Sequence, residues 1–418
     1  MSERQQKPQQ PTARREKVAL ALAGGGPLGA MYEVGTLAAL ADCLDGIDLN
    51  DLDAYVGVSA GALVAAALAN GIPPREMCRI FIETTPGEKE RPLPPGVFMR
   101  PAYAEFGRRL ASLPPLVAGA VWHYLTHPDQ RSALAAFQRL TRALPTGIFD
   151  GSQMDARFAE AFSKPGRTND FRKLPRRLYL VAADLETGNA VKFGTPGWDH
   201  VPISKAMQAS AALPGLYPPV EIGGRYYVDG ALKKTLHASV ALEQGAKLVL
   251  AINPLVPYDS DLAATPHAHA PRRLIEGGLP AVLSQTFRSI IRSRMQSGLA
   301  RYEVEYPDAD IVLFEPNRDD AEVFFTNIFS YASRRRLGEH AYQKTRKELF
   351  ERRHELGPVL ARHGIRLKLD AVTDPARHLV RGMRRHAEPR GAMAVKRRLE
   401  HTLGDLERWL KHQSARAA

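Results

Sequence analysis

Short apolar runs alternate with helical patterns along most of the chain. The run "KVALALAGGG" predicts a first strand, a helical pattern follows from Leu28 to Leu44, and a second apolar run at 55–58 predicts another strand. Further strands are predicted in "RRLYLVAADL", ending near Asp184, in "AKLVLAINP", ending near Asn253, and in "ADIVLFEP". Strands that alternate with helices form a mainly parallel sheet with helices on both faces. The pattern therefore predicts an α/β fold.

Three segments depart from this alternation of strands and helices, and the last two indicate domain limits. "PPVEIGGRYYV" predicts a β-hairpin that turns at Gly223 and Gly224. Residues 86–144 are rich in proline and then helical, and beyond residue 318 the pattern is helical and basic. We expect a disordered leader at 1–16, a main domain at 17–316 with a helical insertion at 86–144, and a basic helical region at 317–418.

The charge is concentrated at the C-terminus. The formal net charge is +12, and residues 331–418 carry 22 Lys/Arg against 10 Asp/Glu. Within this region an amphipathic helix with a basic face is predicted from Leu399, Leu403, Leu406 and Leu410. We interpret it as a solvated helix packed on its own domain or on a partner, with contact to anionic lipid as the alternative. Without a recognised module, we expect no nucleic-acid binding.

The cysteines and the apolar segments exclude several classes of protein. Cys43 and Cys78 lie far apart and lack metal-ligand spacing, so no disulfide framework, metal site or cofactor is predicted. Residues 1–17 have no apolar core of a secretory signal, and "LPPLVAGAVWHYL" is too short to span a bilayer. We expect a cytoplasmic protein that meets membranes peripherally. We interpret "LPPLVAGAVWHYL" as an ordinary packed helix, with a lid or acyl-chain wall as the alternative.

The clearest candidate for chemistry is Ser59 in "GVSAG". Gly57 and Gly61 leave room for the sharp turn of a nucleophile elbow between a strand and a helix. Such a turn exposes the hydroxyl at the carboxyl edge of the sheet, where α/β folds bind ligands. The alternative is a structural turn of small residues.

A glycine run at the end of the first strand fits an oxyanion hole. Gly24, Gly25 and Gly26, followed by Gly29, place backbone N–H groups at the sheet edge that also carries Ser59. The same residues spell GxGxxG, which is also typical of dinucleotide sites. That interpretation requires an acidic residue at the end of the second strand, where Ser59 stands instead.

The base for Ser59 is predicted to be a carboxylate. Asp229 in "YYVDGAL" ends a hairpin strand, whereas Asp184 and Asp150 are weaker candidates at a strand end and a turn. A carboxylate serves as the base if burial raises its pKa and it lies within hydrogen-bond reach of the serine. The histidines that follow the serine lack distinctive context, and we interpret the following as surface residues or helix caps: His200, His237, His267 and His269.

Five motifs in order, "AGGGPLGA", "GVSAG", "DLETG", "SAALPGLYPPVEI" and "YYVDGAL", resemble the patatin-like phospholipases over residues 17–316. The resemblance implies a three-layer α/β/α fold, no metal, and a Ser-Asp dyad without histidine. By position it makes Ser59 the nucleophile and Asp229 the base, and it makes the loop of Gly24, Gly25 and Gly26, closed by Gly29, the oxyanion hole. The family's glycine motif usually carries Arg or Lys where this chain has Leu28.

The resemblance also implies an activity. Members are lipid acyl hydrolases, including phospholipases A and lysophospholipases, so we expect cleavage of fatty acyl esters at a membrane or lipid-aggregate surface through an acyl-enzyme. Two alternatives remain open. One is an esterase that uses the same dyad on neutral lipid, lysophospholipid or polyester, and the other is a non-catalytic lipid-binding scaffold that retains the fold.

Overall fold

A computed structural model of the chain describes residues 16–81, 98, 100–126, 141–259, 261, 274–325 and 331–379. Several predictions fall on other residues and lie outside the described part. They concern the leader, residues 86–97, 99 and 127–140 of the predicted insertion, His267, His269 and the amphipathic helix at 399–410.

A central eight-stranded sheet carries the fold, with the strand order β6-β7-β4-β3-β1-β8-β9 and β5 paired to β4. Strands β4, β3, β1, β8 and β9 are parallel, and β5, β6 and β7 pair antiparallel at one side. The bounds are β1 Val18–Leu22, β2 Leu44–Asp45, β3 Ala54–Val58, β4 Arg177–Asp184, β5 Ala190–Phe193, β6 Val220–Ile222, β7 Arg225–Asp229, β8 Leu248–Ile252, β9 Asp310–Phe314 and β10 Arg366–Leu367. The predicted mainly parallel sheet is confirmed.

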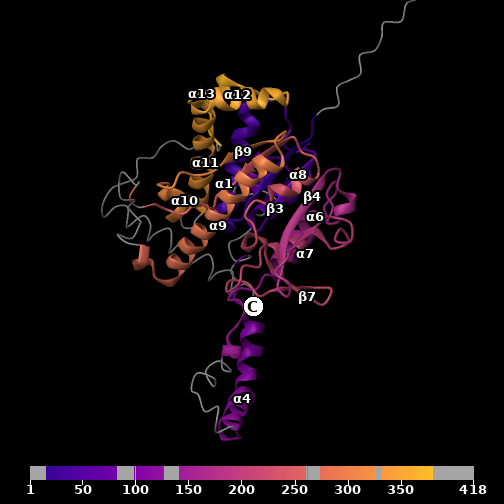
Figure 1. The fold of residues 1–418 in the computed structure, drawn as a ribbon, viewed down its shortest axis with the longest axis vertical. Helices are drawn as coiled ribbons and strands as arrows, with labels where there is room; N and C mark the ends of the chain where they lie inside the picture. Colours follow the sequence, from indigo (N-terminus) through magenta and orange to yellow (C-terminus); the bar gives the residue numbers. More distant parts are fainter. Residues whose placement is uncertain are drawn as a thin grey trace, which may run out of the picture. The chain divides into compact units, whose positions relative to one another are not determined.

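Helices cover both faces of this sheet (Figure 1). Their bounds are α1 Gly26–Cys43, α2 Ala60–Ala69, α3 Pro74–Phe81, α4 Tyr103–Thr126, α6 Ser152–Phe162, α7 Ile203–Ser210, α8 Ala238–Glu243, α9 Gly278–Glu305, α10 Ala321–Phe325, α11 Tyr331–Glu351, α12 Arg353–Arg362 and α13 Leu369–Thr373. On one face, alternate strand residues such as Ala21 and Val56 pack with α8 and with Met295 and Tyr302 of α9. Helix α2 packs closely against the other face at Gly57. The three-layer arrangement follows because strands of a parallel sheet are apolar on both sides.

The predicted hairpin is present, and two smaller features accompany it. Strands β6 and β7 pair from Ile222 to Arg225 across a turn in which Gly223 and Gly224 have φ values of 60° and 77°. These positive φ values strain other residue types, which is why two glycines mark the turn. Strand β5, and the short β2–β10 pair of Asp45 and Arg366, had no comparable signal in the sequence.

The first part of the basic C-terminal region is integral to the sheet-bearing unit. Helix α11 packs on α1 so closely that a Cβ on Gly35 would lie 2.3 Å from the carbonyl oxygen of Gly338. The buried hydroxyls of Thr345 and Thr36 also meet at 3.2 Å. Residues up to Leu379 group into one compact unit, which includes α11.

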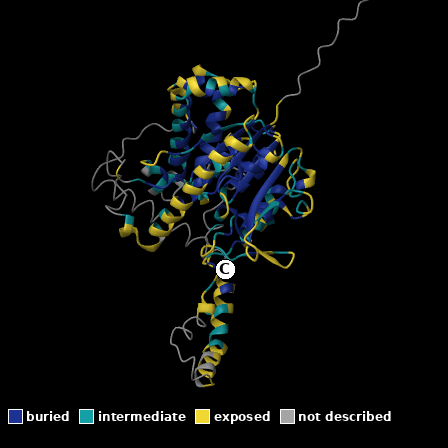
Figure 2. Ribbon diagram, viewed as in Figure 1, coloured by how far each residue is buried: buried dark blue, intermediate teal, exposed yellow. Residues whose placement is uncertain are grey.

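Helix α4 is a correction to the sequence analysis. The apolar side chains of "LPPLVAGAVWHYL" were interpreted as packed, but Val117 is 46% exposed and Trp122 is 70% exposed. Figure 2 colours most of α4 as exposed or intermediate. The prediction is wrong because a pattern of apolar residues does not specify whether another element covers them. None of the helices in the described part of the chain combines the length and the apolarity that a membrane span requires.

Candidate active site

Ser59 lies on a strained turn between β3 and α2. Its backbone has φ 54° and ψ −119°, a left-handed conformation that non-glycine residues rarely adopt. A Cβ on Gly57 would lie 2.5 Å from the carbonyl oxygen of Gly61, and one on Gly61 would lie 2.5 Å from that of Leu22. Glycine is therefore required on both sides of the turn. Such strain at a half-buried serine is typical of a functional site.

Ser210 holds this turn and was not singled out from the sequence. Its hydroxyl accepts a hydrogen bond from the Ser59 N–H at 2.9 Å and donates one to the Val181 carbonyl at 2.6 Å. Ser210 is fully buried at the end of α7, so the contact fixes the backbone of Ser59 against β4. The signal in the sequence was the "SAALPG" segment, which was quoted as a motif but assigned no role.

Asp229 lies at the end of β7, and its carboxyl is close enough to the Ser59 side chain for that side chain to lower its pKa. The two residues meet because β4 is the one strand between β3 and β7, and Asp229 pairs with Ala182 of β4. The Asp229 Oδ1 accepts the N–H of Ala231 at 2.8 Å, and the Asp229 N–H donates to the Ala212 carbonyl at 3.0 Å. The Asp229 N–H and one carboxylate oxygen are thus held in place.

Burial dominates the electrostatics of Asp229. The residue is 3% exposed, and the loss of solvent raises its pKa from 3.8 to about 6, against the lowering effect of hydrogen bonds from Ala231 and Ser59. A carboxylate with this pKa is largely ionised near neutral pH and is a stronger base than one in water. This is the property that the sequence analysis required of a carboxylate partner.

The glycine loop lies beside Ser59. A Cβ on Gly24 would be 3.2 Å from the Cβ of Ser59, so the two backbones are in close contact. Gly25 and Gly29 pack against Pro254, and the Gly29 N–H donates to the Gly25 carbonyl at 3.0 Å, which closes the loop. Helix α1 begins at Gly26, with φ 59°. Within the described residues, no protein group accepts a hydrogen bond from the N–H groups of Gly25 and Gly26.

The other carboxylates considered in the sequence have structural partners. Asp184 is buried, accepts the N–H groups of Glu186 and Thr187, and pairs with Arg225 at 3.3 Å. Asp150 accepts the N–H and the hydroxyl of Ser152 at the start of α6. These contacts account for both residues as turn and helix-start groups.

His237 differs from its sequence-based interpretation. It stands at the N-cap position of α8, as a helix cap, but it is buried and not at the surface. Burial lowers its pKa to about 4, and its Nε2 lies 3.3 Å from the carbonyl oxygen of Gly230. A neutral imidazole that donates to this carbonyl supports the turn after Asp229. His200 is exposed, as expected.

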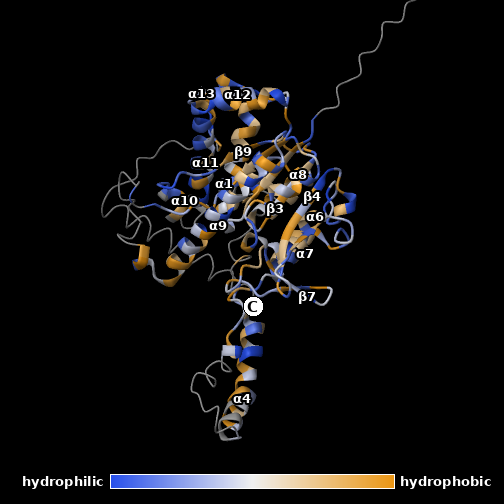
Figure 3. Cartoon of the chain, viewed as in Figure 1, coloured by the Kyte–Doolittle hydropathy of each residue, from blue (hydrophilic) through white to orange (hydrophobic). Residues whose placement is uncertain are grey.

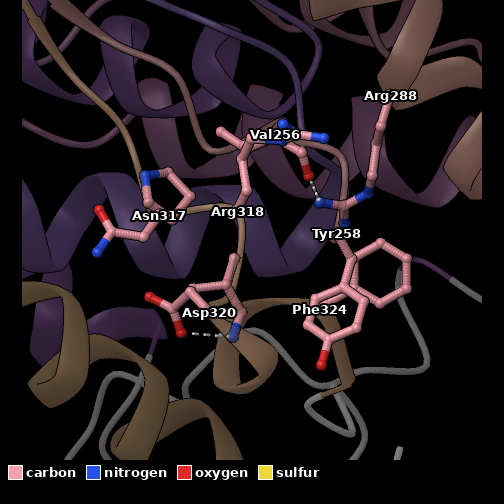
Figure 4. Close-up of a pocket in the computed structure, with 9 residues that line it drawn as sticks. Val256, Tyr258, Arg288, Asn317, Arg318, Asp320 and Phe324 are labelled. Carbon is pink, nitrogen blue, oxygen red and sulfur yellow. Dashed lines mark hydrogen bonds between the residues drawn. The ribbon is translucent and has the colours of Figure 1, made fainter. Parts of the chain in front are cut away.

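Helix α9 holds the chain segment against which the glycine loop packs. The loop packs on Pro254, and the chain beyond it is held by Arg288, whose Nη1 donates to the Val256 carbonyl at 3.1 Å (Figure 4). The Arg288 guanidinium also lies 4.7 Å from the ring centroid of Phe324. Burial lowers the pKa of Arg288 to about 10. The pocket that these residues line has a volume of about 10 Å³, so it is a packed support.

Metal ligands do not gather in the described part of the chain. No group of three or more His, Cys, Asp or Glu side chains there has the proximity that a metal site needs. Cys43 and Cys78 are both buried.

Comparison with known proteins supplies a family and distant structural likenesses. A family model described as patatin-like phospholipase matches residues 20–242. Uncharacterized NTE family proteins of Mycobacterium tuberculosis and Mycobacterium bovis are 39% identical over 67 residues, which are 16% of this chain and 11% of theirs.

Two solved structures align over most of the chain. VipD from Legionella pneumophila has a TM-score of 0.37 at 15% identity, and the match covers 81% of this chain and 67% of that one. A chain of the ExoU-SpcU complex from the type III secretion system of Pseudomonas aeruginosa has a TM-score of 0.26 at 16% identity, covering 84% and 64%.

Proposed function

Since this chain belongs to the patatin-like phospholipase family, we propose that it is a lipid acyl hydrolase that cleaves fatty acyl esters with a Ser59–Asp229 dyad. The observation that carries the proposal is the placement of a strained, half-buried serine beside a buried carboxylate whose pKa is raised and is affected by that serine. The two residues are 170 positions apart in the sequence, and the strand order, with β4 alone between β3 and β7, supports their proximity at one edge of the sheet.

The first half of the reaction forms an acyl-enzyme. The Ser59 Oγ attacks the carbonyl carbon of the ester while the Asp229 carboxylate takes the hydroxyl proton. The tetrahedral intermediate then expels the alcohol, which receives that proton from Asp229. Burial of Asp229 supports this role, because a pKa of about 6 leaves the group ionised near neutral pH yet basic enough to hold the proton briefly.

The second half of the reaction releases the fatty acid. Water attacks the acyl carbon, Asp229 accepts a proton from this water, and the proton returns to the Ser59 oxygen as the carboxylic acid leaves. The net change is one ester plus one water to one acid plus one alcohol. Asp229 acts first as a base and then as an acid in each half of the reaction, so the dyad requires no third residue.

The negative oxygen that develops in both halves needs donors. The N–H groups of Gly25 and Gly26 are suited to this role because the first turn of α1 leaves its N–H groups without helical partners. Gly29 contributes by closing the loop. The N–H of Ala60, at the first turn of α2 directly after the nucleophile, is a further source. A single such donor is worth about 3 kcal/mol of the barrier.

The proposal is tested with an activity-based probe and a lipid panel. Fluorophosphonate labelling of the purified chain should modify Ser59, and Ser59→Ala and Asp229→Asn should each reduce ester turnover by about 10³-fold or more. Turnover of the wild type should fall as the pH drops through about 6, because protonation of Asp229 removes the base. Fatty acids released from phospholipids, lysophospholipids and triglycerides would be identified by mass.

A matched control separates the dyad from a triad. His237→Asn keeps a residue that tolerates the left-handed backbone and removes the imidazole, so labelling and turnover should remain within about tenfold of the wild type. Loss of turnover in that variant with an unchanged melting temperature would contradict the dyad. No labelling of Ser59 in the folded wild type would favour the lipid-binding scaffold, and turnover of triglyceride or polyester alone would favour the neutral esterase.

A further inference from the structure

Helix α4 exposes a broad apolar surface. Residues 110–126 contain no Asp, Glu, Lys or Arg. The exposed fractions of its large apolar side chains are Tyr103 71%, Phe106 42%, Leu110 67%, Val117 46%, Val121 54% and Trp122 70%. Figure 3 colours stretches of this helix as hydrophobic. A water-facing helix normally carries charged side chains on its exposed side, so this surface is suited to an apolar partner.

The charges of this region lie at the first two turns of α4 and beside them. Arg100, Arg108 and Arg142 are exposed, and the Arg108 side chain is 76% exposed. The acidic residue of α4, Glu105, is buried and is bound by Arg108 at 2.8 Å and by Arg109 at 2.9 Å. The described surface at this end is therefore cationic, next to an apolar stretch.

The base of α4 is bonded to the segment that holds Asp229. The Ala102 N–H donates to the Ile148 carbonyl at 2.9 Å, and Phe149 donates to Leu216 at 2.8 Å. Leu216 belongs to the loop that begins at Ala212, whose carbonyl accepts the Asp229 N–H at 3.0 Å. A run of backbone hydrogen bonds thus joins the first residues of α4 to the candidate base.

Exposed apolar side chains continue along this connection. Ile148 is 48% exposed and Leu216 is 41% exposed. They lie between the base of α4 and the loop of Ala212, so the apolar surface extends from the helix toward the residues that hold Asp229.

We propose that α4 docks this protein on an anionic lipid bilayer, with its apolar side chains in the boundary between headgroups and acyl chains and its arginines at the lipid phosphates. A helix with an apolar surface beside basic residues has this mode of binding. The inference rests on the proposed function, because the docked surface supplies the ester to the edge that carries Ser59.

Two features favour lipid over a second protein helix. A helix partner covers one narrow stripe at three- and four-residue spacing. Val121 and Trp122 are adjacent, so they point about 100° apart on the helix, and both are more than half exposed. Tyr103 and Trp122, near the two ends of α4, are the residue types enriched at membrane–water boundaries.

The test measures binding without catalysis. The full chain carrying Ser59→Ala is cosedimented with vesicles of phosphatidylcholine and phosphatidylglycerol at low and high salt. Adding Leu110→Glu, Val121→Glu and Trp122→Glu should lower the vesicle partition coefficient about tenfold or more, because three exposed apolar contacts become charged. In the Ser59-containing protein, the same three changes should reduce turnover of vesicle lipid and leave turnover of a short soluble ester within about twofold.

A matched triple variant controls for added charge. Ile275→Glu, Leu279→Glu and Val304→Glu replace apolar residues that are 72%, 69% and 80% exposed and lie in or beside α9. Vesicle partition of this control should remain within about twofold of the parent. An equal loss in both triple variants would overturn the inference.

Other outcomes are equally decisive. Unchanged vesicle binding by the α4 variant would overturn the inference, as would a halved molecular mass by light scattering, which would show that α4 joins two copies. Binding that requires α4 in a protein that hydrolyses no ester would support the docking surface and reject the proposed function. Hydrolysis of soluble ester by the wild type, together with unchanged vesicle binding by the α4 variant, would support the proposed function and reject the docking surface.

Discussion

The sheet edge at Ser59 and helix α4 depart from ordinary burial in opposite directions. At the edge, Asp229 is 3% exposed, and its carboxylate accepts a hydrogen bond from the Ala231 N–H. Along α4, Leu110 and Trp122 are more than two-thirds exposed. A buried carboxyl and an exposed apolar helix both cost stability in water. We therefore explain the buried carboxyl by its proposed role as a base, and the exposed helix by its proposed contact with lipid.

The two regions also differ in how tightly they are packed. Gly24, Gly57 and Gly61 each have a neighbouring atom within 3.2 Å of the position that a Cβ would take. Gly107 and Gly119 of α4 have none within 4 Å. Chemistry at an ester requires fixed atoms, whereas contact with a fluid surface requires area. The comparison suggests that the same substitution will have opposite effects in the two regions.

The largest expected difference is between Gly61→Ala and Gly119→Ala. At Gly61 the new Cβ would lie 2.5 Å from the Leu22 carbonyl oxygen, and the backbone would have to move. We expect a loss of more than about 3 kcal/mol in the free energy of unfolding, because overpacking here displaces main chain. Gly119→Ala should stabilise α4 by up to about 1 kcal/mol. Urea unfolding measures both, and equal effects would break the comparison.

Asp229→Asn should change how stability depends on pH. The folded protein keeps the Asp229 proton up to about pH 6, whereas the unfolded chain loses it near 3.8, so stability falls as the pH rises between these values. Because asparagine does not titrate, the stability of the variant does not fall over this pH range. Relative to the wild type it should gain up to about 3 kcal/mol between acid and neutral pH. Unfolding curves at several pH values measure the gain; a constant difference between the two proteins would contradict the raised pKa.

Glu105→Gln, at the base of α4, should change the pH dependence of stability in the opposite direction. Burial raises the pKa of Glu105, but hydrogen bonds from Arg109 and Thr146 outweigh it, so the folded pKa is lowered. The ionised carboxylate then stabilises the fold above its unfolded pKa, and this contribution is lost as the pH falls through the folded value. The variant should cost about 1 to 2 kcal/mol at neutral pH and less in acid.

A surface pair provides the control for Glu105→Gln. Glu305→Gln removes a carboxylate that is 40% exposed in its pair with Arg301 on α9, and such pairs contribute under about 1 kcal/mol. Its stability should differ little from the wild type at any pH. If the two glutamine variants behaved alike, the buried position of Glu105 would not be what stabilises the base of α4.

Local signals made the sheet and the positions of its site predictable. The apolar runs correspond to β1, β3, β4, β8 and β9, because a strand covered on both faces reads as a continuous apolar segment. Glycines marked the turn at Gly223 and the loop at Gly24. Ser59 was identifiable because a nucleophile elbow demands small residues at fixed spacing. Ser210 was not, because its role depends on a hydrogen bond to a residue 151 positions away.

Helices α4 and α11 show where the pattern stops being informative. The α11 segment carries several arginines and lysines yet packs on α1, with Leu337, Ala341 and Tyr342 fully buried. The α4 segment is more apolar yet largely exposed. Periodicity specifies that a helix has an apolar side, but burial of that side depends on which element lies against it.

The amino-acid sequence by itself determined the main strands of the sheet, the hairpin turn and the residue types available for chemistry, because these depend on neighbours in the chain. The strand order, which places β4 between β3 and β7, decided that Ser59 meets Asp229. The packing of the elements also decided that Asp229 is shielded from water and that the apolar side chains of α4 remain exposed to it. Burial and long-range contact are properties of three-dimensional packing, and no local pattern contains them.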